Sequence, residues 1–206
     1  LNGLRNQGKA TILVAEDGTC VGVIALSDVL RQAAGNMISR LDKMNTKAVL
    51  LTGDNRRTAD YFAKQVGITS VYAELMPEDK VQSIFKLQQE GKSVCMIGDG
   101  VNDAPALKTA TVGVAMGAIG SDITVDASDI ALMSDDISKI PYLKQLSNAT
   151  VRTIKFSIFL SLFINFVAIL MSLMGWLNPT TGALVHNAGS LFVILIAALL
   201  YDRKFD

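Results

Sequence analysis

The sequence predicts an α/β domain built on a parallel sheet, followed by a hairpin of two transmembrane helices. Two observations support this architecture. The first part of the chain alternates short apolar runs with amphipathic segments, which is typical of parallel strands covered by helices. The second part, from Phe156 to Leu200, contains no Asp, Glu, Lys or Arg. An uncharged stretch of this length is typical of membrane-spanning helices.

The composition agrees with a membrane protein. Half of the 206 residues are hydrophobic and the mean hydropathy is +0.36, which is more apolar than a typical soluble domain. The formal net charge is zero and the basic residues form no cluster, so we expect no nucleic-acid partner. Nothing near Leu1 resembles a signal peptide, and the chain reads as beginning in the middle of a larger protein.

The two cysteines are far apart and form no Cys-x-x-Cys pair. Cys20 and Cys95 each lie in an apolar run that resembles a strand. We therefore expect reduced thiols in the core of a cytosolic domain; a disulfide or a metal site is the alternative.

The elements of the first part follow from apolar runs and their flanking residues. Residues 11–15 and 20–25, separated by Glu16-Asp17-Gly18, predict a β-hairpin. The spacing predicts a helix from Pro77 to Gln89, because Pro77 and the acidic residues after it suit a helix start. We expect that helix to bury Val81, Ile84 and Phe85. Further strands are predicted at 48–51, 93–97, 112–115 and 130–133.

The uncharged stretch breaks in the middle at residues 175–182, so we predict transmembrane helices at 156–174 and 183–200. Trp176 suits a turn at the membrane interface. Basic residues flank both outer ends, which places these ends in the cytoplasm by the positive-inside rule: Lys144, Arg152, Lys155, Arg203 and Lys204. The alternative, a buried helical hairpin, needs a much larger core to cover helices that are apolar all round.

Polar groups follow two of the predicted strands, where open α/β sheets place their ligand sites. Thr52-Gly53-Asp54 comes directly after the strand at 48–51, and its hydroxyl and backbone amides suit phosphate oxygens. The alternative is a plain turn in which Asp54 caps the next helix.

A second cluster, the Gly98–Asp103 loop, follows the strand at 93–97. Asp99, Asn102 and Asp103 supply hard oxygen ligands between glycines, which suits Mg²⁺; the alternative is an acidic, solvated turn. Lys80, in the first turn of the predicted helix, is either a surface charge or the cation that neutralises a transferring phosphoryl group.

Together these residues resemble the haloacid-dehalogenase-type phosphotransfer domain of P-type ATPases. The resemblance rests on four motifs in the right order: Asp28-x-x-Arg31, Thr52-Gly53-Asp54, Pro77–Lys80 and Gly98–Leu107. It implies a haloacid-dehalogenase-like fold that uses ATP and Mg²⁺.

The resemblance also implies residue roles. Asp99 and Asp103 would bind Mg²⁺, with Asn102 organising the site. Thr52 and Lys80 would hold the phosphoryl group. Gly53 and Asp54 would complete the catalytic turn. Asp54 would also help to position the nucleotide and the nucleotide-binding domain. Asp28 and Arg31 would contribute to cofactor binding.

One departure from the family is the missing nucleophile, because no Asp-Lys-Thr-Gly-Thr motif occurs in the sequence. The resemblance therefore implies a C-terminal portion of a pump that does not hydrolyse ATP by itself. The implied organisation is the end of a nucleotide-binding domain (1–25), a phosphorylation domain (26–140), a cytosolic stalk (141–155), two transmembrane helices (156–200) and a cytosolic tail (201–206). The remaining domains of the pump are expected partners.

The presence of two transmembrane helices directly after the phosphotransfer domain resembles the arrangement in the heavy-metal subfamily of P-type ATPases. Asn165 and His186 are the candidate ligands of the transported ion, because polar groups inside a membrane are costly. His186 suits Zn²⁺, Cd²⁺ or Co²⁺, or it is a helix-end histidine hydrogen-bonded to a neighbouring helix. Met171 and Met174 suggest a softer metal, but methionine in a span is more often packing.

The expected function is ATP-driven export of a transition-metal cation through an aspartyl phosphate, by a multi-pass protein of the plasma membrane. The polar residues fit the usual copper pattern poorly, and the usual Lys and Asp of zinc pumps are absent. A copper exporter is the alternative within the family. A membrane-tethered phosphatase and a non-catalytic membrane remnant of the same fold are the alternatives outside transport.

Overall fold

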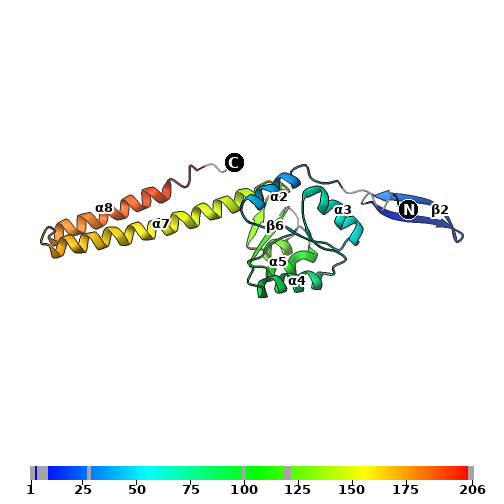
Figure 1. Ribbon diagram of the computed structural model, residues 1–206, viewed down its shortest axis with the longest axis horizontal. Coiled ribbons are helices and arrows are strands. Elements are labelled where there is room, and N and C mark those ends of the chain that lie inside the picture. The colour runs from blue at the N-terminus through cyan, green and yellow to red at the C-terminus, as the bar shows by residue number, and fades with distance from the viewer. Residues whose placement is uncertain (1–2, 4–8, 27–28, 99–100, 118–121, 204–206) are drawn as a thin grey trace. The chain divides into compact units, whose positions relative to one another are not determined.

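The computed structural model describes residues 3, 9–26, 29–98, 101–117 and 122–203 (Figure 1). The chain divides into two compact units, residues 1–138 and residues 139–206. Each is described by itself. The predicted domain boundaries stay predictions.

The first unit opens with the predicted hairpin, β1 (Ala10–Glu16) paired antiparallel with β2 (Thr19–Leu26). Asp17 and Gly18 both have positive φ, 47° and 76°, which a two-residue hairpin turn of right-handed twist requires. Apolar side chains remain exposed on this ribbon, among them Ile12 at 51% and Val21 at 57%. The hairpin therefore gains little from burial against the residues that the structure describes.

The rest of the unit has the predicted parallel strands. β5 (Cys95–Gly98), β6 (Val112–Met116) and β7 (Ile130–Leu132) form one parallel sheet in the order β5-β6-β7. β3 (Val49–Leu51) pairs in parallel with β4 (Ser70–Tyr72). We did not predict β4, because it has only three residues and its one half-buried side chain, Val71, gives no periodic signal.

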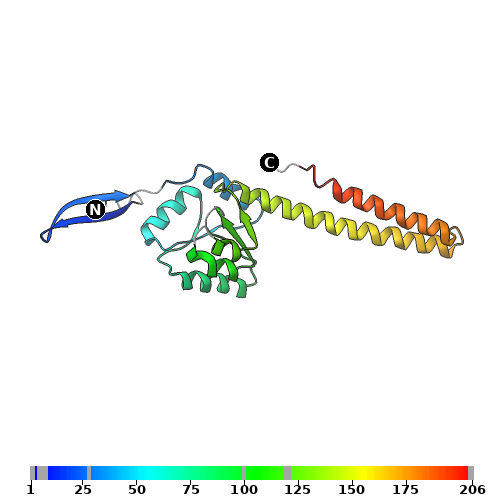
Figure 2. The ribbon, with the colours of Figure 1, turned by 180° about the vertical axis from the view of Figure 1, so that it is seen from behind.

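Five helices of this unit are described: α2 (Ala34–Lys43), α3 (Arg56–Val66), α4 (Pro77–Gln89), α5 (Ala104–Thr109) and α6 (Asp122–Asp126), with a 3₁₀ turn at Val101–Asp103. α4 and α5 lie side by side against the sheet (Figures 1 and 2). The core between them is made by Ile84, Met96, Ala106 and Leu107. It positions the first turn of α4 beside the loop that follows β5.

Two predictions about burial are wrong. α4 has the predicted bounds, and Ile84 is fully buried. Phe85 is 55% exposed, because it follows Ile84 directly and successive residues of a helix point about 100° apart. Cys20 and Cys95 are both exposed rather than in the core. Cys20 lies on the thin hairpin, and Cys95 is the first residue of β5.

The second unit is a helical hairpin, α7 (Lys139–Leu173) and α8 (Pro179–Ala198). α7 starts well before Phe156, because the predicted stalk is helical and continues into the first span without a break. α8 starts at Pro179 rather than at 183, because Asn178 caps it by accepting from the Thr181 N–H at 2.9 Å.

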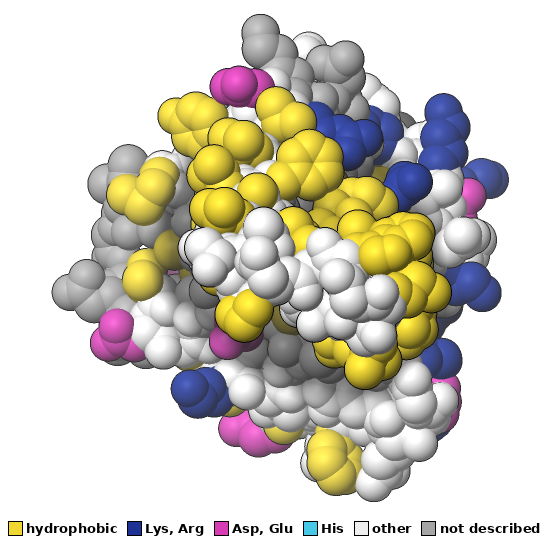
Figure 3. Space-filling model, turned by 90° about the vertical axis from the view of Figure 1, so that its left-hand side faces the viewer, with side chains coloured by type: hydrophobic (Ala, Val, Ile, Leu, Met, Phe, Trp, Pro, Cys, Tyr) yellow, Lys and Arg dark blue, Asp and Glu magenta, His cyan; other side chains and the backbone are white. Residues whose placement is uncertain are grey.

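By length and composition both helices are candidate membrane spans. Many apolar side chains of both helices are exposed, and Figure 3 shows apolar side chains gathered on the face turned toward the viewer. Within the described residues, none of the apolar stretch of either helix is buried. This agrees with a lipid or helical environment rather than with a core supplied by the described part of the chain.

Candidate functional site

The Thr52-Gly53-Asp54 turn directly continues β3. The Thr52 N–H donates to the Tyr72 carbonyl at 3.0 Å, which extends the β3–β4 ladder. The Thr52 hydroxyl donates to Asp54 Oδ2 at 2.8 Å and accepts from the Asp54 N–H at 3.1 Å. The hydroxyl and the carboxylate therefore lie together at the strand end, and their predicted roles toward phosphate and nucleotide stay predictions.

The alternative role of Asp54 as a helix cap is not observed. Asn55 is the cap of α3, because its Oδ1 accepts from the Thr58 N–H at 3.1 Å. Asp54 is exposed, and its Oδ2 has the Thr52 hydroxyl as partner.

The segment that leads into α4 lies against this turn. Leu75 N–H donates to the Thr52 carbonyl at 3.1 Å, and Glu74 N–H donates to the Asp54 carbonyl at 2.8 Å. A Cβ at Gly53 would be 3.3 Å from the Leu75 carbonyl oxygen, which is tighter than ordinary contact. The absence of a side chain at Gly53 therefore lets the two segments approach.

Lys80 is not a surface charge. Its Nζ lies 2.7 Å from Asp103 Oδ1, and the side chains are only 17% and 14% exposed. The first turn of α4 is held by Asp79, whose carboxylate accepts from the Met76 N–H at 3.0 Å. The structure thus joins two of the motifs, the one on α4 and the one after β5, through a charge-assisted hydrogen bond.

The loop after β5 needs glycine at its start. A Cβ at Gly98 would be 2.7 Å from Asp103 Cβ and 2.9 Å from Asp103 Oδ2. Asn102 is exposed in the 3₁₀ turn beside Asp103. Asp99 lies outside the described residues, as does Gly100.

The side chains of Asn102 and Asp103 suit Mg²⁺ by their chemistry. The described residues contain no group of three His, Cys, Asp or Glu side chains that could hold a metal ion. Mg²⁺ commonly takes one or two carboxylates together with phosphate oxygens and water. The carboxylate of Asp103 and the amide of Asn102 are hard oxygen donors on one short turn.

The fourth motif is engaged inside the first unit. Arg31 Nη1 donates to the backbone carbonyl of Asp135, and Arg31 Nη2 lies 3.5 Å from Asp135 Oδ2. Asp28 lies outside the described residues. The structure therefore pairs Arg31 with the loop after β7, and its predicted contribution to cofactor binding stays a prediction.

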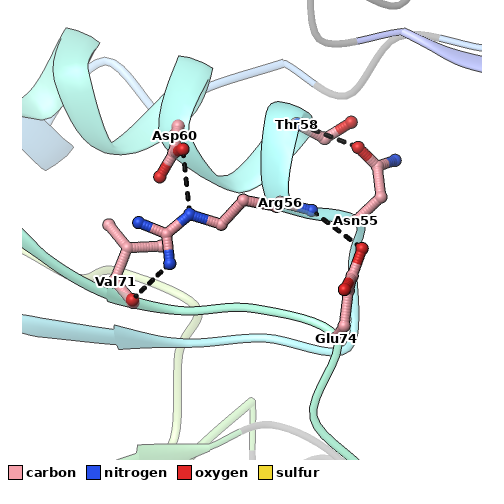
Figure 4. A network of polar contacts seen from close by, with 6 residues as sticks. All are labelled: Asn55, Arg56, Thr58, Asp60, Val71 and Glu74. Carbon is pink, nitrogen blue, oxygen red and sulfur yellow. Dashed lines mark hydrogen bonds and ion pairs between the residues drawn. The ribbon is translucent and has the colours of Figure 1, made fainter.

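Sequence reasoning missed a network around Arg56, at the start of α3 (Figure 4). Its Nε lies 2.9 Å from Asp60 Oδ2, its Nη1 donates to the Val71 carbonyl at 3.2 Å, and its N–H donates to Glu74 Oε1 at 3.4 Å. The Arg56–Asp60 spacing of i and i+4 was visible in the sequence. The contacts with Val71 and Glu74 depend on the β3–β4 pairing and were not.

In the second unit, the two predicted polar residues meet across the hairpin. His186 Nδ1 lies 3.1 Å from Asn165 Oδ1, and a small polar cavity beside them is lined by Ser161, Ile164, Gly189 and Ser190. With Asn165 Oδ1 as the acceptor, Nδ1 donates, and Nε2 keeps its lone pair. The hydrogen bond to a neighbouring helix is thus present, and it leaves a nitrogen able to bind a metal.

The haloacid dehalogenase-like hydrolase profile matches residues 2–111. Over 204 residues the chain is 42% identical to a cadmium-transporting ATPase of Staphylococcus aureus, and the match covers 98% of this chain and 28% of that protein. It is 40% identical to a zinc-exporting P-type ATPase of Mycobacterium marinum, again over 98% of this chain and 28% of that protein. The chain thus spans about 28% of the length of these curated relatives.

Solved structures give the same similarity. A zinc-transporting PIB-type ATPase in its E2.Pi state superposes with a TM-score of 0.86 at 35% identity, over 97% of this chain and 32% of that one. The match includes both the α/β unit and the helical hairpin.

Proposed function

From its membership of the haloacid dehalogenase-like hydrolase family, we propose that this chain is the phosphoryl-transfer and membrane-hairpin portion of a P-type ATPase that exports a transition-metal cation. One observation carries the proposal: the similarity to metal-transporting ATPases runs through nearly the whole chain, soluble unit and hairpin alike. A membrane-tethered phosphatase of the same fold would also carry a membrane anchor, so metal uptake is the measurement that separates the two.

In the proposed reaction an aspartate outside this chain attacks the γ-phosphorus of ATP, so that an acyl phosphate forms and ADP leaves. Water then hydrolyses the acyl phosphate and releases inorganic phosphate. The two steps drive alternate access of a metal site in the membrane. The nucleophile and the nucleotide-binding domain belong to the rest of the pump.

This chain would supply the residues that hold the transferred phosphoryl group. The hydroxyl of Thr52 and the ammonium of Lys80 would contact the phosphoryl oxygens, and Gly53 and Asp54 would shape the turn that presents Thr52. The Lys80–Asp103 pair supports this, because it holds the ammonium in a largely buried place before substrate arrives.

Asp99 and Asp103 would hold Mg²⁺, with Asn102 organising the loop. When bound, Mg²⁺ would neutralise charge on the phosphoryl oxygens. Asp28 and Arg31 would act at the entry to the domain, near the cofactor.

For the transported ion we propose Zn²⁺, Cd²⁺ or Co²⁺, with His186 Nε2 and Asn165 as contributors to its path. Imidazole suits these borderline ions, whereas Cu⁺ prefers thiolate and thioether ligands. Copper is the second candidate, because the chain is also 37% identical to a copper-exporting P-type ATPase of Bacillus subtilis over 98% of its length.

We place α7 and α8 across the plasma membrane with both outer ends of the hairpin in the cytoplasm. The basic residues that flank the apolar stretch support this orientation. Residues 1–25 and 26–140 would then be cytosolic parts of the nucleotide-binding and phosphorylation domains, and 141–155 a stalk.

The test is metal uptake by inside-out vesicles that contain the full-length protein. With ATP and Mg²⁺ we expect uptake of Zn²⁺, Cd²⁺ or Co²⁺, and loss of uptake in Lys80→Ala. Lys92→Ala is the matched control, because Lys92 is an exposed lysine paired with Glu90 away from the site. ATP-dependent Cu⁺ uptake alone would favour the copper alternative. Phosphate release without any metal uptake would favour the phosphatase, and neither activity would favour the remnant.

A further inference from the structure

Glu74 adopts a backbone conformation that is unusual for its residue type. Its φ is +60°, in the left-handed region that glycine and asparagine occupy most easily. Among the described residues, Asp17 and Asn45 are the other non-glycine positions with positive φ, and both are residue types that tolerate it. A glutamate in this conformation costs free energy, which contacts of its side chain can offset.

The backbone of Glu74 is part of the junction between two motifs. Its N–H donates to the Asp54 carbonyl at 2.8 Å, and the next residue, Leu75, donates to the Thr52 carbonyl at 3.1 Å. The left-handed turn at Glu74 brings both N–H groups against the Thr52–Asp54 turn. The chain then continues into α4, which carries Lys80.

The carboxylate of Glu74 reaches the start of α3. Its Oε1 accepts from the Arg56 N–H at 3.4 Å (Figure 4). The first N–H groups of a helix have no partner within the helix, and negative charge is favoured there. Since Asn55 already accepts from Thr58, Glu74 supplies a second acceptor for this helix end.

The side chain of Arg56 connects α3 with β4. Its guanidinium bridges Asp60 on α3 and the Val71 carbonyl on β4, at 2.9 Å and 3.2 Å. The turn at Thr52–Asp54 lies between β3 and α3, so its two ends are fixed by β3 pairing and by this network.

We propose that Glu74 is a positioning residue, which fixes the Thr52–Asp54 turn relative to Lys80 through its carboxylate at the start of α3. The inference rests on the proposed function for the roles of Thr52 and Lys80. Glu74 itself would touch neither phosphate nor metal. Glycine or asparagine would adopt this left-handed backbone more easily, but neither carries a carboxylate that could reach the Arg56 N–H.

The test compares Glu74→Gly, Glu74→Gln and the matched control Asn45→Gly in the full-length protein. Glycine removes the backbone cost and the carboxylate together, whereas glutamine keeps an oxygen acceptor of the same length. Asn45→Gly relaxes a left-handed residue that is exposed and far along the chain from the site. Two readouts are used: ATP hydrolysis, and hydrogen exchange of the backbone amides of residues 52–56.

We expect Glu74→Gly to lower kcat about tenfold with little change in KM for ATP, because phosphoryl transfer is sensitive to small displacements of its ligands. Amide exchange at 52–56 should rise in the same variant. Glu74→Gln should restore both to within about threefold of the parent, since a neutral acceptor keeps part of the bond. Asn45→Gly should change neither.

Unchanged exchange at 52–56 in Glu74→Gly overturns the inference, as does faster exchange with an unchanged kcat. Equal loss in the Gly and Gln variants also overturns it, because the acceptor oxygen would then not matter. If the parent protein hydrolyses no ATP, the proposed function fails, and the exchange result alone decides whether Glu74 holds the turn.

Discussion

The ammonium of Lys80 and the carboxylate of Asp103 are 2.7 Å apart, and their side chains are 17% and 14% exposed. One residue belongs to the first turn of α4 and the other ends the 3₁₀ turn after β5. The pair is partly buried, so removing one partner leaves a charge that is less well solvated than on the surface.

Lys80→Ala should therefore destabilise the first unit. We expect the free energy of unfolding to fall by about 3 kcal/mol, because the Asp103 carboxylate loses its partner. Urea denaturation of the chain in detergent, followed by far-UV circular dichroism, measures the change. Lys92→Ala, whose side chain is 58% exposed, should leave the denaturation midpoint where it is. Equal midpoints for the Lys80 and Lys92 variants would contradict the importance of burial at this pair.

Gly98→Ala tests the close approach at the end of β5. The added Cβ would lie 2.7 Å from Asp103 Cβ, so either the loop or Asp103 must move, at a cost of about 2 kcal/mol. Gly35→Ala is the matched control, because a Cβ there meets nothing within 4 Å and Gly35 lies inside α2. That variant should be neutral or slightly stabilised. The prediction fails if Gly98→Ala unfolds at the same urea concentration as the parent.

Gly189→Val tests the contact between the two membrane helices. A Cβ at Gly189 would lie 2.9 Å from Ile164 Cγ2, next to the Asn165–His186 hydrogen bond. Valine should push the helices apart and weaken that bond, and we expect about a tenfold loss in apparent affinity for the transported metal. Metal-stimulated ATP hydrolysis of the full-length protein measures it. Gly182→Val, also on α8 with open space around its Cβ, is the control, and a similar loss there would point to a general helix defect.

Cysteine labelling tests the proposed orientation of the hairpin. Cys20 and Cys95 are first replaced by serine, and Trp176→Cys or Ser138→Cys is introduced. In intact cells a membrane-impermeant maleimide should label most of the Trp176→Cys protein and little of the Ser138→Cys protein. Permeabilisation should raise labelling of the second severalfold. Labelling of both in intact cells, or of neither, would be inconsistent with a short external turn.

Local sequence signals predicted most of the fold. Pro77 and its acidic neighbours set the start of α4 correctly, and the apolar runs located β3, β5, β6 and β7 to within two residues. β4 was missed because three residues carry too little pattern. Phe85 was assigned to the core because hydrophobicity does not say which face of a helix has a neighbour.

The candidate site was predicted by its residues but not by its contacts. The sequence placed Thr52 after a strand and Lys80 in a helix start, and the structure agrees. Lys80 contacts Asp103, which lies 23 residues further along the chain. This contact depends on where α4 lies relative to the end of β5, which the sequence does not give. Glu74 gave no sequence signal, because its role comes from a left-handed backbone and from a helix end that lies 18 residues earlier in the chain.

The most direct test of the account is phosphorylation of the full-length protein by [γ-³²P]ATP. With Mg²⁺ and the exported metal ion, we predict a label that survives acid and is released by hydroxylamine, as an aspartyl phosphate is, and that is lost in Lys80→Ala but kept in Lys92→Ala. A protein that hydrolyses ATP without ever carrying such a label, or that is labelled equally well in Lys80→Ala, would contradict it.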